Sequence, residues 1–445
     1  MPKVIIAGGG LVGALNACFF AARGWTVEVY ESRKDIRTLE HVPGRSINLA
    51  LSCRGKTALE AVGLREYIVD QGVELHARLV HEPDGKTYHR LPYGQPGEHI
   101  VSINRRHLNE VMLTKAEQAP NVTFFFEHKV RKVDIERNEL HVEYKGTSLV
   151  VGADLIVASD GAYSAVRRSL MTQPRFNYEQ EYIEHGYIEL SILPTASNEF
   201  ALDPNVFHLW PRGKFTMIAL ANKDKTFTVT IFGPFELFEK HLDTPEHVIA
   251  FFTKHFTDAL RLIGPERVLE RFSEIGPQSL VSLKCDPHHF GKGIVLTGDA
   301  AHAMVPFYGQ GMNCGFEDCL VLSDALDKMH DDIPAAIAHY SSTRVRDAHT
   351  CNDLAMYNYQ ELRDLVNHVG YKLRKKLDLM LNRWIPSIWI PQYSMVTFTR
   401  TPYSQIVKDR AWQDQVLSRI RTGALLGALA VAIPIGIRAW KQHRG

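Results

Sequence analysis

Residues 3–13 read K-V-I-I-A-G-G-G-L-V-G, and residues 25–31 read W-T-V-E-V-Y-E. The first apolar run predicts a short buried strand, and the second predicts another strand that ends at an acid. The stretch between them is apolar and predicts a helix. Three glycines of the first segment have the spacing G-x-G-x-x-G, so the whole pattern is typical of a dinucleotide-binding fold.

Each position of this motif has a physical role. Gly8 permits the tight turn from strand to helix, and Gly10 lets a pyrophosphate approach the backbone at the helix N-terminus. Gly13 allows the helix and the strand to pack closely. Glu31 can accept hydrogen bonds from an adenosine ribose, and its negative charge suits the free 2′-hydroxyl of FAD or NAD rather than a 2′-phosphate.

A signal peptide or signal anchor is the alternative for this segment, because residues 4–22 carry no charge and follow Lys3. Such a segment would not need three correctly spaced glycines, or a second β-rich run that ends in Glu31. We therefore favour the dinucleotide interpretation.

The composition is that of a globular protein with two or three structural units, since the chain has 445 residues, 45% of them apolar. Lys plus Arg (51) nearly cancels Asp plus Glu (50), so we expect no nucleic-acid partner. The six cysteines form no C-x-x-C pair, which favours reduced thiols and a cytosolic setting. His288, His289 and His302 lack ligand partners at suitable spacing, so no metal site is expected.

The C-terminus differs from this average. Residues 422–437 form an uncharged apolar run, and no acid occurs after Asp414. A helix of this length rises about 24 Å, short of the roughly 30 Å hydrocarbon core of a bilayer, but flanking basic side chains can snorkel. We favour a membrane anchor over a buried C-terminal helix, and whether it spans the bilayer stays open. The flanking basic residues are Arg419, Arg421, Arg438, Lys441 and Arg444.

Along the chain, residues 44–52 look like a loop, and residues 75–90 look like a hairpin. From about residue 178 the pattern becomes β-rich, with one helix near 245–254, and from 312 to about 385 it is helical. We therefore expect an α/β fold in which a Rossmann-like FAD-binding domain is interrupted by a mainly antiparallel β-sheet substrate domain. The expected boundaries are 1–177 and 286–330 for the FAD-binding domain, 178–285 for the substrate domain, 331–415 for a helical C-terminal region and 416–445 for a basic hydrophobic tail helix.

Two further motifs agree with the first. Residues 154–167 (D-L-I-V-A-S-D-G-A-Y-S-A-V-R) place Asp160 after a predicted strand, and residues 294–313 (I-V-L-T-G-D-A-A-H-A-M-V-P-F-Y-G-Q-G-M-N) place Asp299 after another. A helix that opens at Met312 and Asn313, after a segment with Gly309 and Gly311, would present backbone N–H groups to negative charge on a flavin or pyrophosphate. Taken singly, each of these motifs is an ordinary turn or helix cap, but all three motifs in this order predict a flavin site. Asp299 is suited to bind the ribityl hydroxyls of the flavin.

Together the three motifs resemble those of the single-component flavoprotein aromatic hydroxylases, whose fold is that of p-hydroxybenzoate hydroxylase. R-S-I-N-L-A-L-S at 45–52, G-F-E-D-C at 315–319, M-Y-N-Y at 356–359 and Y-S-M-V-T-F at 393–398 are similar, more narrowly, to the kynurenine 3-monooxygenases. The resemblance implies FAD as the cofactor, with NADPH as a transient co-substrate. It implies that O2 is used to hydroxylate L-kynurenine through a flavin C4a-hydroperoxide, in tryptophan catabolism and NAD biosynthesis.

The resemblance also implies the site residues. No catalytic side chain is expected, because the chemistry belongs to the flavin. The substrate-binding residues are expected to be Arg78, Tyr93, Tyr308, Asn358 and Tyr393, a set in which one guanidinium can bind a carboxylate beside hydroxyl and amide groups. Tyr308 and Cys314 stand where the family leads us to expect Phe and Ala. The cofactor-binding residues are expected to be Gly8, Gly10, Val12, Gly13, Tyr30, Glu31, Ser32, Arg33, Ala50, Arg105, Val130, Asp160, Asp299, Gly311, Met312 and Asn313.

Other interpretations stay open at this point. The chain could hydroxylate another aromatic substrate, reduce quinones, or be a non-redox membrane adaptor on a flavoprotein fold. The tail is similar to the anchor that holds the eukaryotic enzyme on the outer mitochondrial membrane, facing the cytosol, and would contact membrane lipid. Residues 384–391 contain two tryptophans that could enter a membrane interface or form a lid beside Tyr393. The oligomeric state cannot be inferred.

Overall fold

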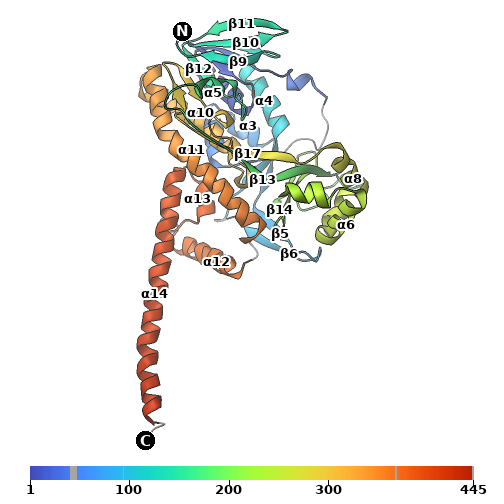
Figure 1. Cartoon of the computed structure of the whole chain (residues 1–445), viewed down its shortest axis with the longest axis vertical. Helices are drawn as coiled ribbons and strands as arrows, with labels where there is room; N and C mark the ends of the chain where they lie inside the picture. The colour runs from blue at the N-terminus through green and yellow to red at the C-terminus, as the bar shows by residue number, and fades with distance from the viewer. Residues whose placement is uncertain (41–47, 94, 366–367, 443–445) are drawn as a thin grey trace.

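The structure is a computed structural model that describes residues 1–40, 48–93, 95–365 and 368–442, with side chains as far as Thr422. Helix α14 (Tyr403–Gln442) begins against the body of the molecule and runs away from it (Figure 1). The small β-sheet near the N-terminus lies at one end of the body, and helix α6 (Pro245–His255) lies on the side away from α14 (Figure 1).

A six-stranded sheet forms the centre of the first domain, in the order β18-β19-β12-β1-β2-β8. Its strands pair in parallel except for β18, and its inner strands are buried on both faces, which explains their continuous apolar sequences. The two strands predicted around the glycine motif are confirmed to within a residue. The strands are β1 (Lys3–Ala7), β2 (Thr26–Tyr30), β8 (Val122–Phe125), β12 (Leu155–Ala158), β18 (His289–Phe290) and β19 (Ile294–Leu296).

Helices cover this sheet and begin at the glycine-rich motifs. Helix α1 (Leu11–Ala22) follows β1 and packs against α4 (Arg105–Glu117) and α10 (Gly311–Lys328). Short helices α5 (Ala165–Leu170) and α9 (Asp299–His302) follow β12 and β19. All three motifs therefore lie at the carboxyl ends of parallel strands, where α/β folds bind ligands.

Two smaller sheets flank the central one. Strands β9 (Lys129–Asp134), β10 (Glu139–Tyr144) and β11 (Thr147–Gly152) form a meander whose second turn is at Lys145 and Gly146, both with positive φ. Strands β3 (Asn48–Leu51), β7 (Ile100–Asn104) and β4 (Val73–Leu75) form the other. The loop expected at 44–52 is therefore wrong for Asn48–Leu51, while 41–47 lie outside the described residues. Strand β3 is stabilised by pairing with β7, a partner that its own sequence cannot reveal.

The second domain is built on a seven-stranded sheet, ordered β17-β13-β16-β15-β14-β5-β6. It is antiparallel except between β14 and β5, and the predicted hairpin supplies β5 and β6, so the sheet also draws on residues far before 178. Its remaining neighbours pair antiparallel, as predicted. The strands are β5 (Ala77–His81), β6 (Tyr88–Pro92), β13 (Asn177–Ile192), β14 (Val206–Pro211), β15 (Thr216–Ala221), β16 (Phe227–Pro234) and β17 (Gln278–Asp286).

Three helices, not one, cover the far face of this sheet. Helix α6 matches the prediction, but α7 (Thr257–Ile263) and α8 (Pro265–Glu274) were not predicted. Gly264, with φ of 91°, ends α7, and Pro265 starts α8, so each helical segment is too short to show a clear period. Their apolar faces bury Phe252 and Phe256 against the sheet.

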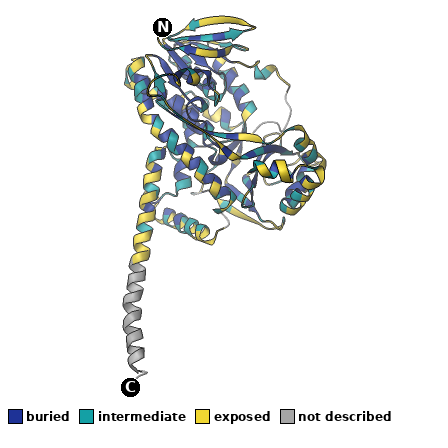
Figure 2. Ribbon diagram, in the orientation of Figure 1, coloured by how far each residue is buried: buried dark blue, intermediate teal, exposed yellow. Residues whose placement is uncertain are grey.

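The C-terminal region is helical, as predicted, and packs against both domains. Helix α11 (Ile333–Arg363) packs on α10 and on the start of α14, whereas α12 (Val369–Trp384) lies at the end of the body beside α14 (Figure 1). Helix α13 (Gln392–Phe398) follows. Within the described side chains, no helix combines the length and apolarity that crossing a membrane requires. The apolar run after Thr422 lies outside that description (Figure 2).

A network of buried charged side chains connects helices α2 (Cys53–Ala61), α10 and α11, next to the glycine-rich motifs. Glu317 on α10 accepts hydrogen bonds from Arg54 of α2 at 2.8 Å and from Arg344 of α11 at 3.0 Å. Asp318 accepts from Arg344 at 2.9 Å and from His302 at 2.6 Å, as well as from the backbone N–H of Gly298 at 2.8 Å. Because each of these buried charges has a partner, the network holds α10 and the turn before Asp299 in place.

Candidate functional site

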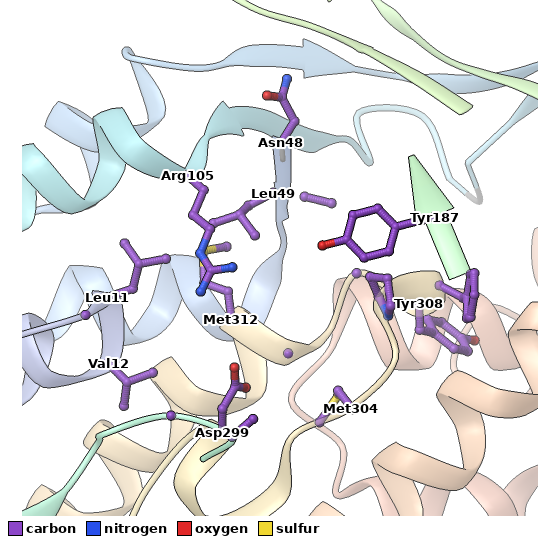
Figure 3. Close-up of a pocket in the computed structure, with 18 of the residues that line it drawn as sticks. Leu11, Val12, Asn48, Leu49, Arg105, Tyr187, Asp299, Met304, Tyr308 and Met312 are labelled. Atoms are coloured by element: carbon purple, nitrogen blue, oxygen red, sulfur yellow. The ribbon is translucent and has the colours of Figure 1, made fainter. Parts of the chain in front are cut away.

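A cavity of about 680 Å³ runs from the carboxyl ends of β1 and β2 to the inner face of the seven-stranded sheet. Arg105, Met312 and Asp299 lie toward one side of the opening, and Tyr187 and Tyr308 lie on the other (Figure 3). The cavity therefore joins the predicted cofactor motifs to the predicted substrate domain.

The glycine turn at one end is shaped for close backbone approach. Gly8 has φ of 96°, and a Cβ atom there would lie 2.5 Å from the carbonyl oxygen of Ser159. A Cβ atom on Gly13 would lie 1.9 Å from the carbonyl oxygen of Gly8. Around Gly10, by contrast, there is open space, and no described side chain caps the start of α1. The free N–H groups of this helix start fit a pyrophosphate.

Glu31 lies beside this turn as a buried, ionised acceptor. Its Oε2 accepts the backbone N–H of Gly9 at 2.8 Å, and its Oε1 accepts Nε of Arg33 at 2.8 Å. Burial would raise the pKa of Glu31, but the hydrogen bonds and charge of Arg33, together with the Gly9 N–H, lower it below its usual value. A carboxylate in this position can accept the hydroxyls of an adenosine ribose, as the sequence predicts.

The other two motifs contribute at the middle of the cavity. Asp160 accepts the backbone N–H of Ala165 at 2.7 Å through one oxygen, while its other oxygen is buried without a partner among the described residues. Burial raises the pKa of Asp160. Asp299 follows Gly298, whose positive φ of 58° makes the turn. No described side chain caps the start of α10, so this second helix start also offers free N–H groups to the cavity.

The predicted cofactor residues all line the cavity except Gly13 and Asn313. Asn313 instead accepts the N–H of Ser52 at 2.9 Å and donates to the carbonyl oxygens of Ala50 at 2.8 Å and Gly309 at 2.7 Å, so it joins β3 to the loop before α10. The residues that line the cavity are Gly8, Gly10, Val12, Tyr30, Glu31, Ser32, Arg33, Ala50, Arg105, Val130, Asp160, Asp299, Gly311 and Met312.

The far end of the cavity brings together four of the predicted substrate residues. The guanidinium carbon of Arg78 lies 4.3 Å from the ring centre of Tyr393, which stacks with Tyr93 at 5.6 Å and with Tyr308 at 5.7 Å. Arg78 is only 6% exposed. The hydroxyl of Tyr93 is buried and makes no hydrogen bond within the described part of the chain. A buried cation beside an unused hydroxyl is suited to an anionic group of a ligand.

Asn358 is not part of this wall. Its Nδ2 donates to the carbonyl oxygen of Phe307 at 2.6 Å, and Phe307 stacks on Tyr359 with ring centres 3.7 Å apart. Asn358 is buried behind the cavity and supports the segment that carries Phe307 and Tyr308. Direct contact between Asn358 and a substrate therefore stays a prediction.

The apolar part of the cavity was not predicted. Strands of the seven-stranded sheet and the segment after α9 supply a wall of aliphatic and aromatic groups suited to an aromatic ring. Alternation along the strands shows which residues share a face, but it does not show which face borders a cavity. The wall residues include Phe207, Ile218, Leu220, Phe232, Met304 and Phe307.

His302 has close partners that its sequence spacing did not show. The potential ligand atoms of His302, Cys314 and Asp318 lie within 4.8 Å of one another, and all three residues are buried. Arg344 lies 2.8 Å from a carboxylate oxygen of Asp318 and donates to Sγ of Cys314 at 3.2 Å. Since a fixed cation already neutralises this group, we assign the cluster to the charge network and not to a metal.

Comparison with known proteins gives close relatives over the whole chain. A family described as "FAD binding domain" matches residues 1–353. Kynurenine 3-monooxygenase of Caenorhabditis briggsae is 63% identical, with 98% of this chain and 98% of the relative covered. The protein of the same name from Sus scrofa is 46% identical, with 94% of this chain and 88% of the relative covered.

Solved structures confirm the predicted fold class. 2-Methyl-3-hydroxypyridine-5-carboxylic acid oxygenase matches with a TM-score of 0.65 at 19% identity, covering 80% of this chain and 90% of that one. PqsL of P. aeruginosa, solved with 2-aminobenzoylacetate, matches with a TM-score of 0.67 at 20% identity, covering 83% of this chain and 99% of that one. At this identity the likeness concerns the fold.

Proposed function

Because this chain belongs to the kynurenine 3-monooxygenase family of FAD-binding enzymes, we propose that it uses NADPH and O2 to hydroxylate L-kynurenine to 3-hydroxy-L-kynurenine. The observation that carries the proposal is the position of Arg78, a buried guanidinium at the far end of a cavity that begins at a dinucleotide-binding turn. An aromatic amino acid has the two parts this end can bind, a ring and a carboxylate.

The residues present fit FAD. The open space at Gly10, the uncapped starts of α1 and α10, the ionised Glu31 and the unpartnered oxygen of Asp160 would hold its adenosine, pyrophosphate and ribityl groups. When bound, FAD supplies the redox chemistry that activates O2.

The chain then has to orient the substrate and keep water out. Arg78 would bind the carboxylate, with Tyr93 and Tyr393 donating beside it. Because this anchor lies at the end of the cavity, the aromatic ring would extend toward the centre, between the apolar wall and the cofactor. The aliphatic and aromatic groups of that wall would help to exclude water from the reacting atoms, which favours oxygen transfer over loss of oxygen as peroxide.

NADPH would visit the site only transiently. The sequence has one G-x-G-x-x-G motif in a strand–helix setting, and the acidic Glu31 there disfavours a 2′-phosphate. NADPH, the hydride donor, would therefore bind without a nicotinamide domain of its own.

A substrate panel tests this function. Purified, flavin-loaded protein should consume NADPH faster with L-kynurenine than without it, and a phenolic acid or a polyketide-type phenol should not have this effect. Stimulation by a phenol alone would support the rival, a flavin hydroxylase of another substrate. A protein purified without bound flavin, and unable to take it up, would support the non-redox adaptor.

We also propose that the chain associates with a membrane, the mitochondrial outer membrane facing the cytosol, through its C-terminal region. Helix α12 supports this proposal, because it exposes Leu373, Met380 and Trp384 along one face, next to the exposed Lys372 and Lys376. Apolar and basic groups together are suited to an anionic lipid surface. Of the two tryptophans considered for this contact, Trp389 is buried and donates to Asp378 at 3.0 Å, so only Trp384 is available.

A further inference from the structure

An acidic side chain lies against the guanidinium that the substrate carboxylate would use. Oε1 of Glu361, near the end of α11, is 3.4 Å from Nη1 of Arg78. Both side chains are largely buried, at 12% and 7% exposure. A buried acid here would repel the carboxylate of a ligand, so its presence at a carboxylate-binding residue calls for a role.

The surroundings of Glu361 form a small chamber beside the main cavity. The chamber has a volume of about 90 Å³ and shares a wall with the main cavity, made of Arg78, Tyr93, Tyr308 and Tyr393. On its other side lie Glu361, Tyr371 and Lys375. Burial, and then the charge of Arg78, lowers the pKa of Lys375 to about 8. Asp378 also lines the chamber, but it pairs with Arg374 and Arg410. Glu361 is therefore the carboxylate next to Arg78, close to where the far end of a substrate would lie.

The chemistry of an α-amino acid accounts for this pair. Its α-carbon carries a carboxylate and an ammonium group, so a site that excludes water needs a cation for one and an anion for the other. Arg78 alone would bind any aromatic acid of suitable length. Arg78 with Glu361 beside it would bind both groups of an amino acid at once and would reject an acid that lacks the amine, because a buried charge would then lose its partner.

We propose that Glu361 binds the α-ammonium group of the substrate while Arg78 binds its carboxylate, which makes this end of the cavity a zwitterion-binding subsite. In the free protein the two side chains neutralise each other, and on binding each exchanges its partner for the opposite group of the substrate. Arg78 and Glu361 together carry no net charge, either alone or with a bound zwitterion, so the exchange avoids most of the desolvation cost of a single unpaired ion. The inference rests on the proposed function and names the group that selects amino acids.

The test compares two ligands on the flavin-loaded holoenzyme: L-kynurenine, and the same acid without its α-amino group, 4-(2-aminophenyl)-4-oxobutanoate. Binding is measured from the change that each ligand causes in the flavin absorbance, and turnover is measured separately. The variant is Glu361→Gln. The control is Asp364→Asn, an exposed acid at the end of the same helix.

We expect the wild-type protein to bind L-kynurenine at least tenfold more tightly than the deamino acid. In Glu361→Gln the Kd for L-kynurenine should rise about 10- to 100-fold, the range for a charge-assisted hydrogen bond. The Kd for the deamino acid should stay the same or fall, because Arg78 no longer has a competing partner. The control should change neither Kd.

Equal weakening of both ligands, or no weakening of L-kynurenine, would overturn the inference. If Glu361→Gln does not fold with its flavin, the wild-type comparison still decides, because equal affinity for the two ligands contradicts the subsite. Failure of the proposed function looks different: the wild-type protein would then bind neither ligand, or bind them without turnover.

Discussion

The carboxylate of Glu31 accepts the backbone N–H of Gly9 at 2.8 Å, so one side chain at the end of β2 is hydrogen-bonded to the glycine turn that follows β1. The same carboxylate has a second oxygen bonded by Arg33 at 2.8 Å. The residue that would bind the ribose thus also fixes the turn that would bind the pyrophosphate, which couples the two contacts to the cofactor.

Replacing Glu31 should therefore weaken FAD binding more than the loss of one contact would suggest. Glu31→Ala is expected to raise the Kd for FAD by about 10- to 100-fold, since it removes a charged acceptor and frees the turn. Flavin content after purification and titration of the apoprotein measure this effect. Glu66→Gln, an exposed acid on α3 (Arg65–Val69), is the control. Unchanged flavin content in Glu31→Ala would contradict the assigned role.

Arg78→Lys should lower kcat/KM for L-kynurenine by about 10- to 100-fold, mainly through KM. Lysine keeps the charge that Glu361 needs but loses the planar fork that binds a carboxylate through two hydrogen bonds. The measurement is steady-state kinetics with the flavin-loaded protein. Arg90, on the neighbouring strand, is exposed, so the control variant Arg90→Lys should leave kcat and KM unchanged. An unchanged KM in Arg78→Lys would place the substrate carboxylate elsewhere.

Asp318→Asn should destabilise the fold by about 3–5 kcal/mol, because it leaves His302 buried without a carboxylate and leaves Arg344 with Glu317 alone. The midpoint of thermal or denaturant unfolding measures the effect, and flavin affinity should fall with it, since Asp318 also holds Gly298 before Asp299. Asp324→Asn, exposed on the same helix, is the control. A variant as stable as the wild type would show that the network does not support the site.

The stability loss in Asp318→Asn should also depend on pH. Burial would lower the pKa of His302, but the Asp318 carboxylate raises it well above its usual value. In the wild type, the stability from His302 is therefore fully present below about pH 6.5, the unfolded pKa, and is lost as pH rises through the folded pKa. In the variant Cys314 still favours the charged form of His302, but the larger contribution of Asp318 is gone, so burial opposes protonation more strongly and much of this stabilisation is lost at low pH. The difference in melting temperature between the wild type and Asp318→Asn should be larger at pH 6 than at pH 8. A difference that becomes smaller toward pH 6 would contradict this.

Trp384→Ser should weaken binding of the full chain to vesicles with anionic lipid by about tenfold, because binding then no longer transfers the large apolar surface of the tryptophan from water into the lipid. Vesicle co-sedimentation measures the change. Tyr88→Ser, an equally exposed aromatic on β6, is the matched control. Deleting residues 423–445 should weaken binding further. If Trp384→Ser binds as well as the wild type, α12 does not touch the membrane.

Much of the cofactor half could be predicted from the sequence, because its signals are local. The glycines and Glu31 lie within one β-α-β unit, and the strands of that unit were placed to within a residue. Strand β3 was missed because its partner β7 is distant, and α7 and α8 were missed because Gly264 and Pro265 divide them into short segments.

The substrate half depends on contacts across the chain. Arg78 could be assigned only through the family resemblance, since an arginine on a strand is usually solvated. Glu361 was not assigned at all, because it lies 283 residues from Arg78 in the sequence and no local pattern relates the two. Asn358 was assigned through the same resemblance. Its side-chain amide donates to the carbonyl oxygen of Phe307, and its contact with a substrate stays a prediction.

The most direct test of the proposed function is the origin of the oxygen in the product. Flavin-loaded protein would be supplied with NADPH, L-kynurenine and ¹⁸O-labelled O2, and the product would be identified by mass spectrometry. The account predicts 3-hydroxy-L-kynurenine that carries one labelled oxygen, formed only with all three reactants. Oxidation of NADPH to give hydrogen peroxide alone, with L-kynurenine recovered unchanged, would contradict it.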